Sequence, residues 1–285
     1  MTELTLATRG SKLALAQSGL VADAITETFP DVTVRLVTVE TTGDRDRSTD
    51  LTALTELGAF VRAVQSAVLE GRADLAVHSA KDLPVVGPSA LIGFHPRRAD
   101  AADALIGESL EDLPVGATVG TGSPRRSAQL QALRKDLQVV PIRGNIETRI
   151  SLVGSDAVDA VVLAVAGLDR AGLSQHVAYR FSPREMVPAP GQGALTIETR
   201  PGTLAAEIAA NLEDEDTRAA VDAERSLLEI TGAGCRSALG ALARVEGERL
   251  VMDAFVADER GPRRTTVEGI DPRDVAEAAK KELGL

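Results

Sequence analysis

A short apolar stretch that runs directly into polar residues lies at residues 73–84, with the sequence ADLAVHSAKDLP. Its first half, residues 73–78, is typical of a buried strand, and the polar residues after it are typical of a loop. A similar stretch, VDAVV at residues 158–162, also places an acidic residue ahead of an apolar run. The repetition predicts two lobes that share one plan, each built around such a strand.

The rest of the chain alternates short runs rich in Val and Ile with longer stretches of helical spacing. This rhythm is typical of open, largely parallel sheets that are covered by helices. Ser11 is placed to cap the first helix. We expect strands at residues 4–7, 32–39, 73–78, 117–120, 138–142 and 159–163, and helices at residues 12–28, 59–70, 124–133, 145–152, 219–228 and 272–283.

Pro and Gly are frequent in residues 183–193, which suits a hinge between the lobes. The predicted fold class is therefore α/β, with two similar lobes and a small α+β domain at the C-terminal end. We expect the first lobe to comprise residues 1–96 and 194–212. The second lobe is expected at residues 102–187 and the C-terminal domain at residues 216–285.

Composition argues against several classes of partner. The chain has 285 residues, 44% of them hydrophobic, with a formal charge of −11, five Phe, one Tyr and no Trp. Aromatic platforms for nucleic-acid bases are therefore nearly absent, and the net charge repels phosphate backbones. No apolar run is long enough for a membrane span. Residues 1–4 do not begin a secretion signal, so we expect a cytoplasmic protein.

A bound metal ion is not expected. The chain has a single cysteine, Cys235, and three histidines without the spacing of metal ligands. His78 is more typical of a packed, hydrogen-bonded residue than of a catalyst.

Arginine is concentrated in the loops that follow the predicted strands. These residues are Arg9, Arg125, Arg126, Arg143, Arg149 and Arg170. Ligands of open α/β sheets bind beyond the carboxyl ends of the strands, and guanidinium groups match carboxylates and phosphates. The pattern predicts a ligand with several negative charges. Solvated surface pairs are the alternative for any single arginine.

Two adjacent arginines, Arg125 and Arg126, stand at the predicted start of a helix. The N-terminus of a helix is already partly positive, so arginines there are unfavourable without an anion nearby. These two residues are therefore the strongest individual indication of an anion site.

Asp82 and Cys235 are the candidates for chemistry. Asp82 follows a strand in a region rich in cations, where a carboxylate can stabilise a cationic intermediate, although a loop salt bridge with Lys81 is the alternative. Cys235 lies between Gly234 and Arg236, which favours an exposed thiol beside a cation over a small buried side chain.

Seven motifs in order resemble the porphobilinogen deaminase (hydroxymethylbilane synthase) family. They are ATRGS at 7–11, HSAKDLP at 78–84, VGTGSPRR at 119–126, IRGN at 142–145, LAVAGL at 163–168, GQGA at 191–194 and GC at 234–235. The resemblance implies two similar periplasmic-binding-protein-like α/β lobes with a hinge and a small C-terminal α+β domain. It also implies a monomeric transferase of tetrapyrrole and heme biosynthesis, which joins four porphobilinogen molecules head to tail with loss of ammonia and releases the product by hydrolysis.

The resemblance assigns roles to individual residues. It implies a dipyrromethane cofactor attached through a thioether to Cys235, and it makes Asp82 the carboxylate that contacts pyrrole nitrogens and faces the cation formed when ammonia leaves. Catalytic roles are also implied for Arg9, Arg143 and Arg149. The implied cofactor-binding residues besides Cys235 and Asp82 are Asp44, Ser79, Lys81, Thr121, Ser123, Arg125 and Arg126. The implied substrate-binding residues are Arg9, Ser11, Arg143, Arg149, Arg170 and Gln192.

The sequence also departs from the family pattern. Thr42, Ala53 and Leu57 stand where the family usually has basic residues, which predicts weaker retention of the cofactor unless Arg45 or Arg47 substitutes. Two other classes of function stay open on the residues alone. A non-catalytic, two-lobed protein that binds a small anion would not need Cys235, and a nucleic-acid-binding regulator would lack any recognisable binding motif.

Overall fold

The structure is a computed structural model, and it describes residues 2–39, 53–155, 157–233 and 237–285. The described chain forms two compact units. The first unit comprises residues 1–98 and 194–218, and the second comprises residues 99–193 and 219–285. The three domains expected from the sequence, with their boundaries, stay a prediction.

The first unit contains a mixed sheet with the strand order β2-β1-β3-β10-β4. Its strands are β1 (Thr2–Thr8), β2 (Val32–Thr38), β3 (Leu75–Ser79), β4 (Ile92–Phe94) and β10 (Leu195–Thr199), and its helices are α1 (Lys12–Thr28), α3 (Ala53–Leu69), the 3₁₀ turn η1 (Ala80–Asp82) and α7 (Leu204–Ala210). Strand β1 is parallel to both β2 and β3, whereas β10 is antiparallel to both β3 and β4.

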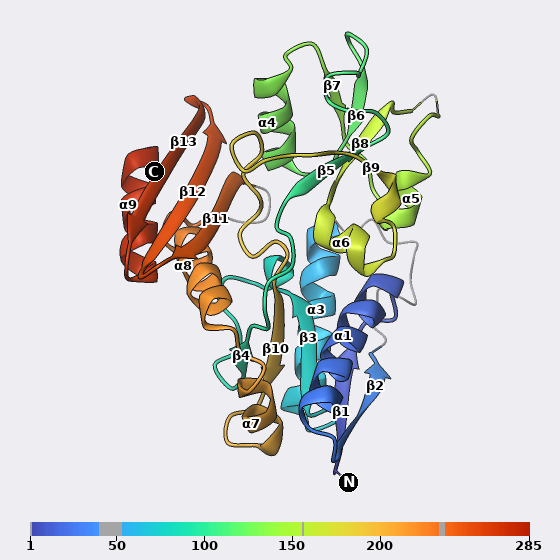
Figure 1. The fold of residues 1–285 in the computed structure, drawn as a ribbon, viewed down its shortest axis with the longest axis vertical. Coiled ribbons are helices and arrows are strands. Elements are labelled where there is room, and N and C mark those ends of the chain that lie inside the picture. The colour runs from blue at the N-terminus through green and yellow to red at the C-terminus, as the bar shows by residue number, and fades with distance from the viewer. Residues whose placement is uncertain (1, 40–52, 156, 234–236) are drawn as a thin grey trace. The chain divides into compact units, whose positions relative to one another are not determined.

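Helices cover both faces of this sheet (Figure 1). On one face, Val21 and Ile25 of α1 and Ile208 of α7 pack against apolar residues of β1, β3 and β10. On the other face, Val64 and Val68 of α3 pack against Ala7 of β1 and Ala76 of β3. Alternation along each strand thus feeds two separate cores, which is the reason that β3 is apolar along most of its length.

The second unit contains a sheet of the same plan, with the order β7-β6-β8-β5-β9. Its strands are β5 (Asp103–Ile106), β6 (Thr118–Gly120), β7 (Gln138–Val140), β8 (Ala160–Ala164) and β9 (Val177–Arg180), and its helices are α4 (Pro124–Leu133), α5 (Ile146–Ile150), α6 (Val165–Arg170) and the 3₁₀ turn η2 (Ser174–His176). Strand β6 is parallel to β7 and β8, and β5 is antiparallel to β8 and β9. The two-lobed α/β fold is confirmed.

The acidic residues that precede β3 and β8 have the same structural role. Asp74 Oδ2 accepts a hydrogen bond of 2.8 Å from the backbone N–H of Thr5 in β1. Asp159 Oδ2 accepts one of 2.7 Å from the backbone N–H of Thr118 in β6. The repeated acidic residue noticed in the sequence therefore ties the central strand of each sheet to its parallel neighbour.

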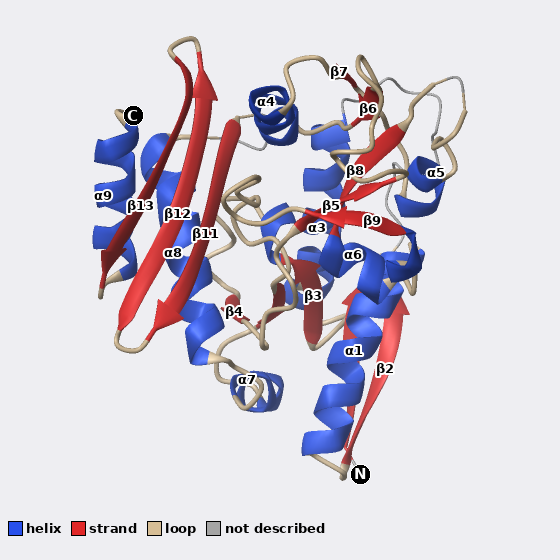
Figure 2. Cartoon of the chain, turned by 45° about the horizontal axis from the view of Figure 1, so that its top comes forward, coloured by secondary structure: helices blue, strands red, loops and turns tan. Residues whose placement is uncertain are grey.

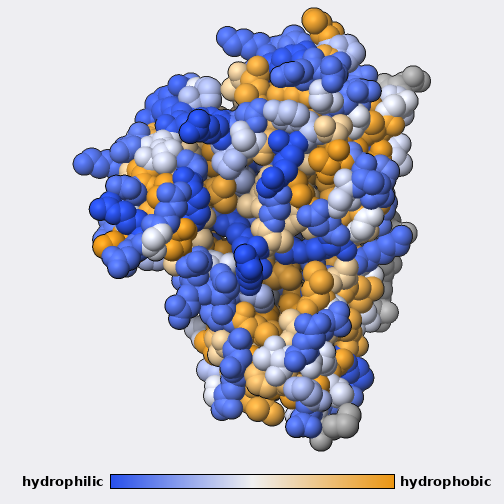
Figure 3. Space-filling view, in the orientation of Figure 1, coloured by the Kyte–Doolittle hydropathy of each residue, from blue (hydrophilic) through white to orange (hydrophobic). Residues whose placement is uncertain are grey.

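The C-terminal part of the second unit is an antiparallel sheet with two helices on one face (Figure 2). Its elements are α8 (Glu215–Thr231), β11 (Ala238–Glu246), β12 (Arg249–Asp258), β13 (Gly261–Gly269) and α9 (Pro272–Leu283). The first four residues of α8 belong to the first unit and the rest of the helix to the second. Leu227 of α8 and Val275 of α9 share one core with Met252 of β12. Hydrophilic residues are frequent on the surface of this part of the molecule (Figure 3). Arg249 and Glu268 form an exposed ion pair between β12 and β13.

The sequence predicted α1, α4 and α9 with the bounds that the structure has. Each begins after a residue whose side-chain oxygen accepts a backbone N–H bond, namely Ser11, Ser123 and Asp271. The expectation of largely parallel sheets was wrong, because the unpredicted strands β5 and β10 enter their sheets antiparallel to their neighbours. Among the described residues, no helix is both long enough and apolar enough to cross a membrane.

Two segments of the chain meet at Gly193, the last residue of the Pro- and Gly-rich segment. The other segment contains Ala99. The N–H of Ala99 donates a 3.3 Å hydrogen bond to the carbonyl oxygen of Gly193. Gly193 has φ of 87°, and a Cβ built there would lie 2.6 Å from the carbonyl oxygen of Ala99. Only glycine fits this crossing without displacing the backbone.

The variant Gly193→Ala tests this requirement. We expect it to lower the free energy of unfolding by about 3 kcal/mol, because strain from positive φ adds to a backbone clash. Gly172→Ala is the control, since Gly172 has φ of 68° but open space around its Cβ position. That control should lose only about 1 kcal/mol in urea unfolding. Equal losses in the two variants would contradict the proposed clash.

Candidate active site

In the first unit, the predicted site residues lie at one edge of the sheet. Strands β1 and β3 are parallel, so their carboxyl ends point the same way. Arg9 and Ser11 follow β1, and Ser79, Lys81 and Asp82 lie at the end of β3 and on the turn η1. The fold therefore brings these residues, which are separated in sequence, to a common edge.

Local contacts fix the backbone at this edge. Ser11 Oγ accepts a 3.3 Å hydrogen bond from the N–H of Ala14 and caps α1. The Arg9 guanidinium carbon lies 4.0 Å from the centroid of the Phe60 ring. Ala80 donates its N–H to the carbonyl oxygen of Ala194 at 3.0 Å, which ties the turn η1 to the start of β10. Asp82, on the same turn, is half-buried.

Beneath this turn lies a buried polar group that the sequence did not indicate as a unit. His78 Nε2 lies 3.1 Å from Glu198 Oε2, and both side chains are buried. Gln65 Nε2 donates to both oxygens of the same carboxylate, at 3.1 and 3.0 Å. His78 is thus packed, as predicted, but its Nε2 makes no hydrogen bond of good geometry, which differs from the prediction. The contact with Glu198 joins β3 to β10, and Gln65 joins Glu198 to α3.

In the second unit, the parallel strands β6, β7 and β8 direct the remaining site residues to one edge. Thr121, Ser123, Arg125 and Arg126 follow β6, Arg143 and Arg149 follow β7, and Arg170 follows β8. Ser123 caps α4 by accepting from the N–H of Arg126, and the Ser123 N–H donates to Thr121 Oγ1 at 3.2 Å. The two hydroxyls set the start of the helix that carries Arg125 and Arg126.

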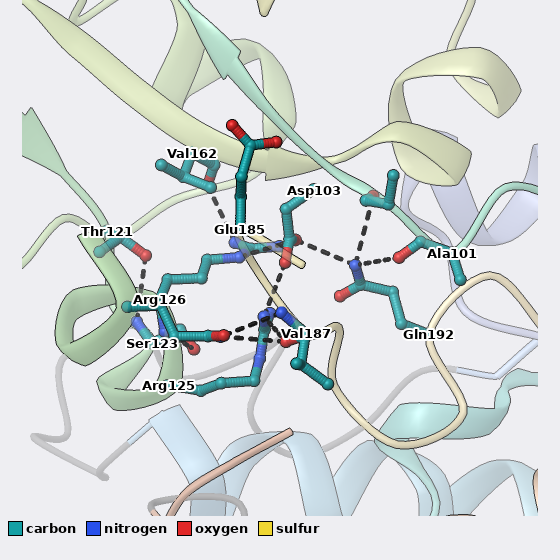
Figure 4. Close-up of polar contacts among 12 residues, drawn as sticks. Ala101, Asp103, Thr121, Ser123, Arg125, Arg126, Val162, Glu185, Val187 and Gln192 are labelled. Atoms are coloured by element: carbon teal, nitrogen blue, oxygen red, sulfur yellow. Dashed lines mark hydrogen bonds and ion pairs between the residues drawn. The ribbon is translucent and has the colours of Figure 1, made fainter. Parts of the chain in front are cut away.

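The side chains of Arg125 and Arg126 converge on one carboxylate, that of Asp103 at the start of β5 (Figure 4). Arg125 Nη1 donates to Asp103 Oδ2 at 2.7 Å. Arg126 Nε and Nη2 donate to Asp103 Oδ1 at 2.9 and 2.6 Å. Asp103 is fully buried, and the two arginines are only 3% and 7% exposed. The anion expected near this helix start is thus supplied at least in part by the chain itself.

Asp103, Arg125 and Arg126 form an ion triad, and the pKa values of its members follow from burial and from the charges of the neighbouring members. Burial would raise the pKa of Asp103, but the guanidinium groups of Arg125 and Arg126 and a hydrogen bond from Gln192 hold it well below its usual range. Burial lowers the pKa of Arg125, Asp103 opposes that shift, and Arg126 adds to it. The carboxylate therefore stays ionised, between two cations.

Arg149 brings further positive charge to the same region. Burial lowers its pKa, and so does the positive charge of Arg126. Arg149 Nε donates to the carbonyl oxygen of Gly144 at 2.8 Å, which fixes the loop that carries the exposed Arg143. Gly144 has φ of 112°, and a Cβ there would lie 2.8 Å from a methyl group of Thr148. The cluster of Arg125, Arg126 and Arg149 is suited to hold carboxylates.

Arg170 contacts the Pro- and Gly-rich segment, and Gln192 lies within that segment. Arg170 Nη2 donates to the carbonyl oxygen of Gly193 at 2.7 Å, and burial lowers the pKa of Arg170. Gln192 is buried, and its Nε2 donates to Asp103 Oδ1 at 2.9 Å and to the carbonyl oxygen of Ala101 at 2.7 Å. Gln192 thus supports the ion triad.

Sequence reasoning missed three buried polar residues of the second unit. The sequence did not indicate Asp103 as a site residue, because Asp103 begins the short strand β5, which was not predicted. Gln129 of α4 exchanges hydrogen bonds with Val187, with its Nε2 donating at 3.0 Å and its Oε1 accepting at 2.8 Å. Glu224 of α8 accepts from the N–H groups of Gly191 and Ala243. The only indication of these three residues in the sequence is that each places an acidic or amide side chain among the apolar residues of a strand or helix.

Some predicted residues cannot be placed. Asp44, Cys235 and Thr42 lie outside the described residues. Ala53 and Leu57 lie on α3, but their side chains are also outside the description. Within the described part of the chain, no group of three or more His, Cys, Asp and Glu side chains could hold a metal ion.

Comparison with known families explains this arrangement. The family model described as "Porphobilinogen deaminase, dipyromethane cofactor binding domain" matches residues 4–208, and the model of the C-terminal domain of the same family matches residues 218–285. The chain belongs to the porphobilinogen deaminase family. The predicted resemblance is therefore confirmed over nearly the whole sequence.

Similar proteins agree with this assignment. A porphobilinogen deaminase of Acidothermus cellulolyticus is 45% identical over 92% of this chain and 81% of its own length. One of Deinococcus deserti is 41% identical over 100% of this chain and 95% of its own length. Among solved structures, the methionine binding protein MetQ is 12% identical with a TM-score of 0.45, covering 74% of this chain and 89% of that one. That distant likeness carries no argument about function.

A loop before Val187 is held by Glu185, which accepts hydrogen bonds from Ser182 N–H at 2.8 Å and Ser182 Oγ at 2.7 Å. The hydroxyl of Tyr179 donates to the same carboxylate. This hydrogen bond, together with burial, raises the pKa of Tyr179 to about 12. The phenol therefore stabilises the folded state fully below about pH 10, and the contribution is lost as pH rises toward 12.

Tyrosine absorbance tests this contact directly, because Tyr179 is the only tyrosine and tryptophan is absent. We expect the absorbance at 295 nm, about the wavelength at which tyrosinate absorbs, to titrate with a midpoint near 12. In Glu185→Gln the midpoint should fall toward the ordinary value of about 10. Glu108→Gln is the control, because Glu108 is exposed and its charge is not among those that shift the pKa of Tyr179. An unchanged midpoint in Glu185→Gln would contradict the assigned hydrogen bond.

Proposed function

We propose that this chain is a hydroxymethylbilane synthase, a transferase that joins four porphobilinogen molecules head to tail with loss of ammonia and releases the linear tetrapyrrole by hydrolysis. The observation that carries the proposal is the match of both family models, in order, across residues 4–208 and 218–285. Relatives that cover the whole chain are named as the same enzyme. The non-catalytic anion-binding alternative is not favoured.

The described residues fit a dipyrromethane cofactor with several carboxylates. Arg125, Arg126 and Arg149 form a positive cluster in which one buried carboxylate, Asp103, faces two of the guanidinium groups. Buried positive charge of this kind is stabilised by an added anion. We propose that Arg125, Arg126, Lys81, Ser79, Thr121, Ser123 and Asp44 hold the cofactor and that Cys235 carries it through a thioether. When bound, the cofactor supplies the pyrrole end to which the new chain is joined.

Asp82 is proposed as the catalytic carboxylate. It lies on the turn η1 at the carboxyl end of β3, and the N–H of Ala80 anchors that turn to β10. A carboxylate held there can contact the pyrrole nitrogens of porphobilinogen and stabilise the positive charge that develops as ammonia leaves. The fixed backbone keeps the carboxylate in position during that charge development.

Substrate carboxylates are assigned to a second set of cations, which shares Arg149 with the cluster of Arg125, Arg126 and Arg149. We propose that Arg9, Arg143 and Arg149 hold the acetate and propionate groups of the substrate and the growing chain. Ser11, Gln192 and Arg170 complete this set, although the contacts of Gln192 and Arg170 in the second unit make them supports of the backbone as well. The exposed Arg143 can follow a longer chain because its side chain is in solvent. That the protein is cytoplasmic and monomeric stays a prediction.

Intact mass spectrometry tests the attachment. We expect the purified protein to carry an adduct of two joined pyrrole units, and Cys235→Ser to lack it, because serine cannot form a thioether. Cys235 is the only cysteine of the chain, so no other sulfhydryl can take its place. An adduct of the same mass on Cys235→Ser would exclude Cys235 as the carrier.

The variant Asp82→Asn tests the carboxylate. It should keep the fold and the adduct but lower turnover of porphobilinogen by about 100-fold or more, since the neutral amide cannot stabilise a developing cation. Asp112→Asn is the control, because Asp112 is exposed and bonds locally to Ser109. Turnover close to that of the unaltered protein would remove Asp82 from its role.

A further inference from the structure

Asp103 is a buried charged residue to which neither the family resemblance nor the proposed mechanism gives a role. It opens β5, next to β8 in the centre of the second-unit sheet, and its carboxylate is fully buried. Both oxygens are used: Oδ2 accepts from Arg125, and Oδ1 accepts from Arg126 and Gln192. A buried carboxylate is costly unless it is paired in this way.

The two guanidinium groups are held by more than this carboxylate (Figure 4). Arg125 Nη1 also donates to the carbonyl oxygen of Val187 at 2.7 Å. Arg126 Nη1 donates to the carbonyl oxygen of Val162 in β8 at 2.9 Å. Each guanidinium is therefore fixed at two points, one on Asp103 and one on the backbone, and a planar fork fixed at two points has a defined orientation.

The charge of this ion triad is as informative as its geometry. Two guanidinium groups face one carboxylate, so the three residues retain one positive charge among the described groups. Arg149 adds to it, because its charge interacts unfavourably with that of Arg126. With no carboxylate the two cations would repel each other, and with two carboxylates the group would be neutral. A single aspartate provides alignment and leaves attraction for a further anion.

We propose that Asp103 is a positioning residue of the cofactor site, which aligns the guanidinium groups of Arg125 and Arg126 so that they receive a carboxylate of the dipyrromethane. This inference rests on the proposed function. Asp103 itself does not contact the cofactor; it acts through the two arginines. Gln192 supports it from the other side, by donating to the same carboxylate.

The experiment measures the fraction of purified protein that carries the pyrrole adduct, by intact mass spectrometry, in variants expressed identically. We expect Asp103→Asn to lower the ratio of loaded to unloaded protein at least tenfold at a temperature where circular dichroism shows it folded. Asp136→Asn is the matched control, because Asp136 also pairs with an arginine next to α4, at 2.6 Å, but at the exposed end. Its loading should equal that of the unaltered protein.

A second measurement separates positioning from a purely structural role. If Asp103 acts through Arg125 and Arg126, the loss of loading in the double variant Asp103→Asn/Arg126→Gln should be smaller than the product of the losses in the two single variants, because part of the role of Asp103 is already removed with Arg126. Independent structural defects would instead multiply, and that result would overturn the proposal. If Asp103→Asn is unfolded, the variant Asp103→Glu is used instead. Glutamate keeps the negative charge, but its carboxylate lies one methylene group farther from the backbone. Reduced loading of folded Asp103→Glu supports positioning, and full loading overturns it.

The outcomes also distinguish the two levels of the argument. If the unaltered protein carries no pyrrole adduct, the proposed function fails. If the unaltered protein is loaded and folded Asp103→Asn is loaded equally, the proposed function stands and the role of Asp103 is refuted.

Discussion

The ion triad of Asp103, Arg125 and Arg126 connects several elements of the second unit through one buried carboxylate. It joins β5 to the first turn of α4, and through backbone carbonyl groups it reaches β8 and the Pro- and Gly-rich segment. Removing one partner of such a buried pair costs about 3–5 kcal/mol, because the other charge remains buried without compensation. The ion triad keeps one net positive charge, so the same three residues can also attract a carboxylate of a ligand.

Two sheets of identical plan explain why the candidate residues gather. In each sheet one strand, β1 or β6, has parallel neighbours on both sides, so the loops after β1 and β3 emerge at one edge of the first sheet, and those after β6, β7 and β8 at one edge of the second. A Gly-Ser pair precedes the first helix of both lobes, at Ser11 and Ser123, and each serine caps its helix. Similar lobes thus offer similar loops, but five of the six candidate arginines, all except Arg9, lie in the second.

The segment before Ala194 links the arginine cluster to the C-terminal part of the second unit. Val187 accepts from Arg125, and the N–H of Ala241 in β11 donates to the carbonyl oxygen of Pro188 at 2.9 Å. Glu224 of α8 accepts from Gly191 N–H in this segment and from Ala243 N–H in β11. The two elements that flank Cys235 in sequence, α8 and β11, are therefore anchored to the backbone that also orients Arg125.

The sequence by itself determined the local elements and the family. Caps at Ser11, Ser123 and Asp271 set helix starts within a few residues, and ordered motifs such as HSAKDLP at 78–84 indicated the chemistry, because both depend on neighbours in sequence. Tertiary structure alone decided that β5 and β10 enter their sheets antiparallel and that Asp103 meets Arg126, which is 23 residues away. It also joined His78 to Glu198 across 120 residues of chain. Such pairings depend on which strands become neighbours, and no local propensity encodes that choice.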